Sequence, residues 1–480
     1  MDLFSKRQGA CDTAPYTLYG KNHFELGVVA ALHSGKLVGS IVRMLARWAK
    51  RDPVRCLRVT REATARKGFL SRECPSVIRE LEGLAQGLGM NVEDLLCARS
   101  ILESCFLSHC TNFGAVPPAT ADQDITVSWN FDAALILKLI MGRSPLFVRD
   151  VEGTLPYVCL GVPALFGIGM LNAEGLCCVV NAVGMIDDGE GFSPFELNNM
   201  AMEACTTVGE AAGVIEQGPR QATKSMVFGL LMNWNTIWAD RHGDLSVIEY
   251  SHNHFHREKA GAEGIIASAN HHQFLDRSLS GSFDPGSQKE ITGSYSRLAR
   301  MWTLLREHHG EINPQVAKLI VSDHLPDYSL LKEFGIEREW WEEMVDNATI
   351  CAHAWNYRRH LLKGEFQQAQ IEASWSRTLY SLQIQPLTYT VWFTNGRPCR
   401  NRTRPLYWGR MLGVETQPAP IGTEPAEFLR PETELEVRGI FRKDPGPLED
   451  RLARLWFSAV DLVEKSNFEK RDKEKEGPPG

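Results

Sequence analysis

The sequence predicts an α+β protein in which helices and sheets are stacked in layers. Helical spacing dominates from 20 to about 103, where apolar residues such as Phe24, Val28 and Leu32 recur on one helix face. After Ser108 the pattern changes to short apolar runs that Gly, Pro and Asn interrupt, which is typical of strands. Strands that alternate with helices along one chain favour a layered α and β fold.

The remaining elements follow in chain order. Apolar runs predict strands at 125–127, 157–160, 176–180, 226–237, 245–250 and 388–393, and helical spacing predicts helices over 195–215 and 296–307. A further helical excursion, rich in Trp, Glu, Arg and Gln, is expected at 337–376. The Pro- and Glu-rich segment 416–480 predicts a solvated tail with one amphipathic helix at about 448–463.

Composition and charge narrow the class of protein. Hydrophobic residues make up 43% of the 480 residues and charged residues 23%, so a sizeable core is expected. The formal net charge of −7, with no long basic run, argues against nucleic acid or a membrane as partner and favours a small molecule. The first residues lack an apolar signal-peptide core, and twelve cysteines are too few for a disulfide framework, so we expect a cytoplasmic location.

Candidate catalytic residues lie where the helical front end gives way to strands. Cys110 stands in the run 108–113, although a single cysteine is by default a buried, inert thiol. Asn130 and Asp132 follow on a predicted strand, where alternation places both side chains on one face. There they could orient a neighbouring nucleophile, whereas a carboxylate at a strand end is more commonly a solvated or turn residue.

Three later segments can support such a nucleophile. The turn 172–176 joins two buried strands, with Gly175 suited to the turn conformation, and Asn181 lies on the second strand. Asn270 ends an apolar strand, where its amide can donate to a developing oxyanion. An ordinary turn at the end of a strand would show the same sequence pattern. Arg297 lies in the first turn of a predicted helix, where the helix dipole disfavours a positive charge. This position suggests a functional role for Arg297, with an ordinary surface arginine as the alternative.

In this order and at these spacings, the motifs resemble the Ntn-hydrolase family of isopenicillin N acyltransferase (acyl-coenzyme A:6-aminopenicillanic acid acyltransferase) and, more distantly, the choloylglycine hydrolases and penicillin V acylases. The strongest matches are Cys110-Thr111-Asn112-Phe113 to the Cys-Thr nucleophile motif, Asn130-Phe131-Asp132 to an Asn-aromatic-Asp motif, and 172–176 to an Asn-x-x-Gly-Leu turn. Further matches, which extend the resemblance with gaps from Gly20 to Cys399, are 20–35, 80–87, Ala269-Asn270-His271, Ser296-Arg297-Leu298, Asp323-His324 and Gly396-Arg397-Pro398-Cys399.

The resemblance implies a four-layer αββα Ntn-hydrolase sandwich with two antiparallel sheets between helical layers. It also implies a helical N-terminal segment (1–109), a catalytic domain (110–415) containing the helical insertion 337–376, and a C-terminal tail (416–480). The chain is expected to cleave itself between His109 and Cys110, so that the front end becomes an α chain or propeptide and Cys110 an N-terminal nucleophile.

The same resemblance implies the roles of the site residues. Asp132 would orient the free amine of Cys110, Asn270 with a backbone N–H near Asn181 would form the oxyanion hole, and Arg297 would hold the groups of Cys110 and Asp132 in place. The implied reaction is hydrolysis of a linear amide (N-acyl) bond through an acyl-cysteine; the alternative is N-acyl transfer to an amine, with acyl-CoA as a possible substrate. The predicted site therefore comprises Cys110, Asp132, Asn270 and Arg297 as catalytic residues and Asn130, Asn181, Thr111 and Trp129 as substrate and oxyanion support.

Two positions depart from the family pattern. His109 stands where close relatives usually have glycine, and its side chain restricts the strained conformation that an N-to-S acyl shift needs. Trp129 stands where relatives carry Gln or Arg, so an apolar wall replaces a polar contact to substrate. With Phe113 and Phe131 beside the nucleophile, we expect a substrate with an apolar or aromatic part.

Functions of two other classes stay open. His252, His254 and His256 alternate and, on a strand, would present three imidazoles on one face, as a zinc hydrolase could use them. A non-catalytic binding protein on the same scaffold is the other alternative. The pairs at 271–272 and 308–309 are expected at the surface.

Cys110, Asp132 and Arg297 are all present, and the absence of any one of them would have favoured a binding protein. We therefore favour the cysteine enzyme. We then expect no metal and no cofactor, and a small-molecule amide or acyl donor as partner. The cleaved N-terminal fragment is expected to stay bound, and a homo-oligomer is left open.

Overall fold

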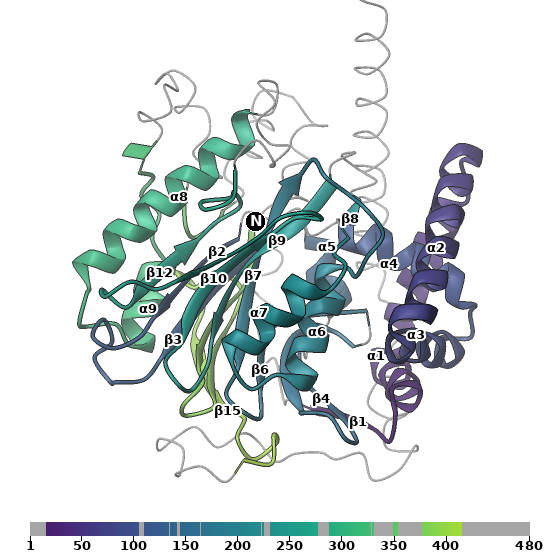
Figure 1. Cartoon of the computed structure of the whole chain (residues 1–480), viewed down its shortest axis with the longest axis horizontal. Helices are drawn as coiled ribbons and strands as arrows, with labels where there is room; N and C mark the ends of the chain where they lie inside the picture. Colours follow the sequence, from purple (N-terminus) through teal and green to yellow (C-terminus); the bar gives the residue numbers. More distant parts are fainter. Residues whose placement is uncertain are drawn as a thin grey trace, which may run out of the picture.

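Two β-sheets lie face to face, and helices cover the outer side of each (Figure 1). The computed structural model describes residues 16–104, 110–133, 135–141, 145–163, 165–221, 223–224, 231–276, 288–327, 329–330, 349–353 and 377–414. Within these residues the predicted α+β sandwich is confirmed. The predicted cleavage site at His109, most of the helical insertion 337–376 and the tail 416–480 lie outside the described residues, and the proposed domain division stays a prediction.

The front end consists of one strand and four helices among the described residues: β1 (Tyr16–Gly20), α1 (His23–Ala49), α2 (Pro53–Glu73), α3 (Pro75–Leu88) and α4 (Val92–Ser104). Asn22 caps α1, its side chain accepting a hydrogen bond from Glu25 N at 3.0 Å. Helices α1 and α3 pack closely at two glycines: a Cβ on Gly27 would lie 2.0 Å from the Glu80 carbonyl oxygen, and one on Gly83 2.0 Å from that of Phe24. These glycines let the two helix backbones touch.

The nine-stranded sheet carries the front end at one edge. Its path runs β1, β4 (Leu146–Val151), β5 (Tyr157–Val162), β6 (Phe166–Asn172), β7 (Cys177–Met185), β9 (Leu231–Ala239), β10 (Leu245–Tyr250) and β11 (Phe255–Lys259), with β8 (Thr223–Lys224) paired to β9. Strand β1 runs parallel to β4, whereas the other pairs are antiparallel. The expectation of purely antiparallel sheets is therefore wrong at this edge, because a strand from the front end joins the sheet after a long helical connection.

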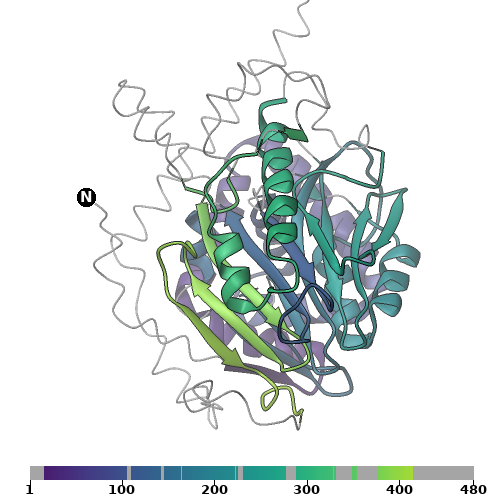
Figure 2. The same ribbon diagram turned by 90° about the vertical axis from the view of Figure 1, so that its left-hand side faces the viewer.

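The six-stranded sheet carries the predicted nucleophile. Its order is β12 (Ile265–Ser268), β2 (Thr111–Ala115), β3 (Thr126–Ala133), β13 (Arg377–Gln385), β14 (Thr390–Asn395) and β15 (Thr403–Tyr407), and every neighbouring pair is antiparallel. Helices α8 (Gln288–Glu307) and α9 (Pro314–Val321) cover its outer face and appear in green in front of the strands in Figure 2. A separate apolar cluster, which includes Phe113, Leu298 and Ile320, fills the space between them.

On the opposite side, α6 (Pro194–Ala204) and α7 (Val208–Gln217) cover the nine-stranded sheet, and α5 (Leu135–Met141) lies near β5 and β13. The single helix expected over 195–215 is split, because Thr207 starts α7 with a capping box closed by Glu210. The main apolar core lies between the sheets and extends to the front-end helices.

Among the described residues, no single helix has both the length and the apolar character needed to cross a bilayer. One bent pair, His23–Ser34 with Val38–Ala49, meets the criterion by length and composition alone.

Candidate active site

Cys110 lies immediately before β2, between the two sheets. Its side chain belongs to the inter-sheet core and is 1% exposed. The Cys110 Sγ lies 3.8 Å from the backbone oxygen of Asp132, on the neighbouring strand β3. The two segments that the sequence predicted to work together are therefore adjacent.

Arg297, on α8, connects the nucleophile segment with the end of β12. Its guanidinium is fully buried and donates from Nη1 to the Cys110 backbone oxygen at 2.7 Å and to Thr111 Oγ1 at 2.9 Å. From Nη2 it donates to Asn270 Oδ1 at 2.8 Å. A planar fork of this kind fixes the relative positions of three partners, which a single ammonium could not do.

Burial also sets the charge of this arginine. Desolvation lowers the pKa of Arg297 to about 10, while the neighbouring Asp132 and Cys110 act in the opposite direction. Arg297 is therefore a buried cation at neutral pH. A buried cation stabilises a negative charge on nearby groups, including a thiolate.

Asn270 bridges the two sheets. Its Nδ2 donates to the Ala182 carbonyl of β7 at 2.8 Å, and its backbone N–H donates to Ser294 Oγ at 2.8 Å. With Oδ1 held by Arg297, the amide is oriented at both ends. The sequence predicted Asn270 but not Ser294, which holds Asn270 from the preceding turn of α8 and has no signature of its own at the sequence level.

Asp132 is fully buried near the end of β3. Burial raises the pKa of its carboxyl to about 8, against the opposing effects of the Thr378 hydroxyl and the Arg297 charge. Among the described residues, no hydrogen bond of ordinary geometry reaches either carboxylate oxygen. Asp132 is thus a buried acid with unused acceptor capacity, and a nearby ammonium group would strongly favour its ionised form.

Thr111 and Asn130 stand opposite each other in the β2–β3 register. The Asn130 Nδ2 donates to the carbonyl oxygens of Val321 at 2.8 Å and Ile350 at 3.0 Å. Asn130 therefore fastens the end of α9 and the segment 349–353 onto the outer face of the sheet. In this structure its amide nitrogen acts as a structural anchor.

Asn181 and Trp129 lie on the inter-sheet side. The Asn181 Nδ2 donates to Asn112 Oδ1 at 2.8 Å, which links β7 to β2. The Trp129 ring is fully buried, lies 5.1 Å from the Phe131 ring between centroids, and closes on the bare backbone of Gly169. Both residues are near the nucleophile strand, and neither is in the Arg297 network.

The predicted turn at 172–176 is present, and Gly175 has the positive φ, 78°, that was expected of it. Asn172 organises the turn: its Oδ1 accepts from the backbone N–H groups of Glu174 and Leu176 at 3.0 Å each. Its Nδ2 donates to the carbonyls of Met202 and Cys205 at the end of α6. The motif therefore holds a sheet turn against a helix.

The alternative in which three histidines bind zinc does not fit the geometry of the strands. Residues 251–254 form the connection between β10 and β11, so the three histidines do not share one strand. His252 Nδ1 contacts the Arg220 carbonyl, and His256 Nε2 lies 3.0 Å from Glu258 Oε2.

The expected exposure of His271 and His272 is also wrong. Both side chains are buried, with His271 Nδ1 2.7 Å from Ser294 Oγ and His272 Nδ1 3.6 Å from a carboxylate oxygen of Glu249.

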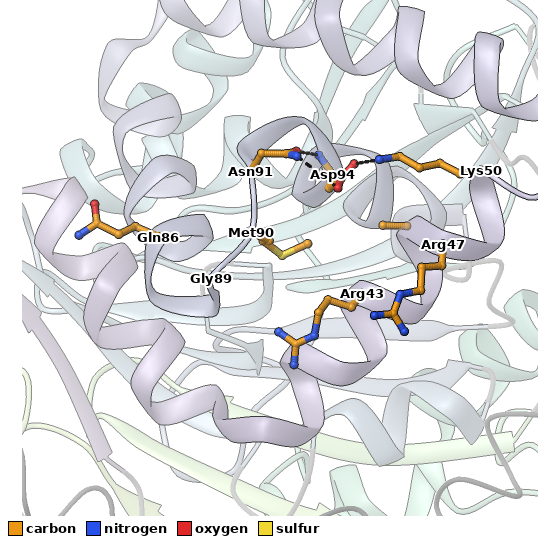
Figure 3. Close-up of a pocket in the computed structure, with 9 residues that line it drawn as sticks. Arg43, Arg47, Lys50, Gln86, Gly89, Met90, Asn91 and Asp94 are labelled. Carbon is orange, nitrogen blue, oxygen red and sulfur yellow. Dashed lines mark hydrogen bonds and ion pairs between the residues drawn. The ribbon is translucent and has the colours of Figure 1, made fainter.

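A hollow of about 560 Å³ lies in the front end, away from these residues. Figure 3 shows Arg43 and Arg47 of α1 on one side of it, and Asn91 and Asp94 on another, with Lys50, the residue after α1, pointing to Asp94. Asp94 already pairs with Lys50, and Arg43 Nη1 donates to the Leu88 carbonyl at 3.0 Å. None of the residues that line this hollow belongs to the Arg297 network.

Part of the chain matches the model of a known family. Residues 144–335 match the model of the family described as "Acyl-coenzyme A:6-aminopenicillanic acid acyl-transferase". This segment contains Asn181, Asn270 and Arg297, and it begins after Cys110 and Asp132. No curated protein matches the sequence.

The solved structures to which the chain shows similarity include two hydrolases. Penicillin V acylase from Agrobacterium tumefaciens is 11% identical, with a TM-score of 0.33, and the match covers 62% of this chain and 85% of the acylase. A mutant of the conjugated bile acid hydrolase from Clostridium perfringens is 10% identical, with a TM-score of 0.31, and the match covers 62% of this chain and 96% of the hydrolase. The family match confirms the resemblance first seen in the motifs: residues 144–335 are similar to the acyl-coenzyme A:6-aminopenicillanic acid acyltransferases.

Proposed function

We propose that the protein is an Ntn-type amide hydrolase or acyltransferase in which Cys110 is the nucleophile. In the favoured form, the chain cleaves itself before Cys110 and then hydrolyses a linear N-acyl amide through an acyl-cysteine. The family match supports the class of enzyme. The observation that carries the assignment of the residues is the buried guanidinium of Arg297, which holds both the Cys110 backbone and the Asn270 side chain.

The chemistry that follows needs no histidine. A free α-amino group has a pKa of about 8 and can take the thiol proton of the same residue. Asp132 has unused acceptor capacity close to the Cys110 segment and would pair with that amine in its charged form. Arg297, as a buried cation, would favour the thiolate.

Asn270 would then serve the acyl transfer itself. Its side-chain amide is fixed by Arg297 and Ala182, and its backbone N–H by Ser294, so little reorganisation is needed when a tetrahedral oxyanion forms. A single preorganised donor of this kind typically lowers the barrier by about 3 kcal/mol. For this role Nδ2 uses the hydrogen that does not bind Ala182.

N-acyl transfer to an amine is the close alternative, and the description of the matching family favours it. Hydrolase and transferase share the acyl-cysteine and differ in whether water or an amine resolves it. Transfer requires a pocket that excludes water after acylation. Buried Trp129 and Phe131 share the inter-sheet core with the Cys110 side chain and are consistent with an apolar acyl group, whereas Phe113 packs in the cluster under α8 and α9 on the other face of the sheet.

Turnover by wild type, Cys110→Ala and Cys205→Ala tests the nucleophile. Cys205 is the matched control because its thiol is also buried, at the end of α6, outside the Arg297 network. Each protein is incubated with N-acyl amides that carry linear or aromatic acyl groups, and separately with acyl-CoA and an added amine. We expect no product from Cys110→Ala and wild-type rates from Cys205→Ala, and equal rates in both variants would overturn the assignment.

A further inference from the structure

Four metal-binding side chains converge at the outer face of the six-stranded sheet, beyond the end of α9. His324 follows α9, Cys351 and His353 lie in the segment 349–353, and Cys399 follows β14. One ligand atom from each of the four lies within 4.8 Å of the others. The four residues come from three distant parts of the sequence, and none of them belongs to the Arg297 network.

The distances within this cluster fit a tetrahedron around one ion. Zinc bonds of ~2.3 Å to sulfur and ~2.0–2.1 Å to nitrogen give tetrahedral edges of about 3.8 Å between sulfurs, 3.6 Å between sulfur and nitrogen, and 3.4 Å between nitrogens. Cys351 Sγ and Cys399 Sγ are 3.6 Å apart. His353 Nε2 lies 3.6 Å from Cys351 Sγ, 3.3 Å from Cys399 Sγ and 3.0 Å from His324 Nε2.

The backbone holds the two central ligands in place. The N–H of Cys351 donates to the Asp323 carbonyl at 3.0 Å, and the N–H of Ala352 donates to Thr378 Oγ1 at 3.0 Å. Cys351 and His353 are buried, Cys399 is half-buried and His324 is exposed. The cluster is therefore anchored on its inner side and open to solvent at His324, which gives an ion a route in.

We propose that His324, Cys351, His353 and Cys399 bind one zinc ion as a structural Cys2His2 site. Two thiolates balance the charge of the divalent ion, and binding releases the two thiol protons to solvent. Two sulfur and two imidazole ligands select zinc over magnesium or calcium. Because protein ligands fill all four positions, the ion has no open position for substrate, so the site is structural.

The position of the site gives the ion a function in the fold. The segment 349–353 lies against Asn130, through the Ile350 carbonyl, and against Thr378, which is paired with Asp132 across the strands. Zinc would fasten this segment to the sheet directly behind the buried acid.

Arg397 faces the ligand set. Its Nη1 donates to His353 Nδ1 at 2.9 Å, so this nitrogen carries no proton while the contact exists. A neutral His353 that binds zinc through Nε2 carries its proton on Nδ1, and Arg397 therefore turns away when zinc binds. Arg397 is the charged side chain that must move.

The test measures metal on the full-length chain, purified under reducing conditions without chelator. Elemental analysis should find about one zinc per chain, and replacement by cobalt(II) should give the intense visible absorption of tetrahedral cobalt with thiolate ligands. Cys399→Ser and His324→Ala should lower zinc affinity at least tenfold and lose the cobalt spectrum. Both altered residues are at least partly exposed, so circular dichroism is expected to show intact folds.

The matched controls are Cys74→Ser and His308→Ala, which change a partly buried cysteine and a histidine elsewhere in the chain. Both should keep zinc and the cobalt spectrum. The proposal is overturned if wild type binds less than a tenth of an ion per chain, or if the ligand variants bind as tightly as the controls. A disulfide between Cys351 and Cys399 in the reduced preparation, detected as the loss of two hydrogens in the intact mass, would also overturn it.

Discussion

Replacing Arg297 by lysine keeps the positive charge of this position and removes its planar fork. In the structure, Nη1 reaches the Cys110 carbonyl at 2.7 Å and Nη2 reaches Asn270 Oδ1 at 2.8 Å. A lysine ammonium can replace one of these nitrogens but not both, so either the nucleophile segment or Asn270 loses its donor.

The loss can be put in energy terms. A hydrogen bond to a charged group contributes roughly 1.5–3 kcal/mol, and the abandoned oxygen stays at least partly buried. Since 1.4 kcal/mol corresponds to a factor of ten, Arg297→Lys should lower kcat/KM by roughly 10- to 150-fold if the lost contact positions Asn270 in the transition state. The free energy of unfolding should fall by a similar amount of about 1.5–3 kcal/mol.

Urea unfolding followed by tryptophan fluorescence, together with steady-state kinetics, measures both quantities. Arg306→Lys is the control, because Arg306 lies on the same helix with a side chain that is 64% exposed and a long, solvent-exposed contact to Glu263. We expect this control to change stability by less than about 0.5 kcal/mol. Equal behaviour of the two variants would refute the reasoning that Arg297 fixes the geometry of the site.

Two further predictions concern buried charges. Glu80 of α3 pairs with buried Arg149 of β4, which holds the pKa of Glu80 at about 2, so Glu80→Gln should cost roughly 3–5 kcal/mol in urea unfolding. The control Glu82→Gln changes a partly exposed neighbour whose only partner among the described residues is the exposed Arg79, and it should cost less than about 1 kcal/mol. A loss no larger than that of the control would contradict this. Burial raises the pKa of Asp132 to about 8 in the uncut folded chain, whereas the unfolded chain releases this proton at about pH 4. The folded chain therefore binds one proton more between these two pH values, and the contribution of Asp132 to the free energy of unfolding falls as the pH rises from about 4 to 8. The urea midpoint should therefore drop less between pH 5 and pH 8 in the double variant Cys110→Ala/Asp132→Asn than in Cys110→Ala alone, both of which stay uncut. Identical drops would count against a neutral buried Asp132.

The Glu80 pair also bears on the fate of the front end. Glu80 of α3 pairs with Arg149 of β4, His23 Nε2 lies 3.7 Å from a carboxylate oxygen of Glu203 of α6, and Arg66 of α2 and Arg99 of α4 pair with the buried Glu196 of α6. These ion pairs join the front-end helices to elements that follow Cys110. They support the prediction that the N-terminal fragment stays bound after cleavage.

The sequence predicted most of the elements around the nucleophile, because strand alternation and turn chemistry are local. The alternation along β3 predicts that Asn130 and Asp132 share one face. The turn at Gly175 is also predicted, and its φ of 78° favours glycine. The resemblance that rests on the order of the motifs places Cys110, Asn270 and Arg297 in one site. Their hydrogen bonds in the structure fit that grouping.

The missed features are those that depend on tertiary contacts. Strand β1 pairs with β4 across more than a hundred residues, and no local pattern indicates a parallel partner. His271 and His272 looked like a surface turn, but α8 and the neighbouring sheet cover them. The sequence does not predict the cluster of His324, Cys351, His353 and Cys399, because long segments separate its members, whereas ligand motifs are recognised in a sequence by close spacing. The histidines at 252, 254 and 256 have such close spacing, but they do not form a ligand set because the connection between β10 and β11 includes the first two and β11 the third.

The most direct test of the central claim is the intact mass of the purified protein, with wild type beside Cys110→Ala. The account predicts two chains from wild type, broken between His109 and Cys110, and one unbroken chain from the variant. A single uncut chain from both, in preparations that are folded, would contradict the proposal that Cys110 becomes an N-terminal nucleophile by self-cleavage.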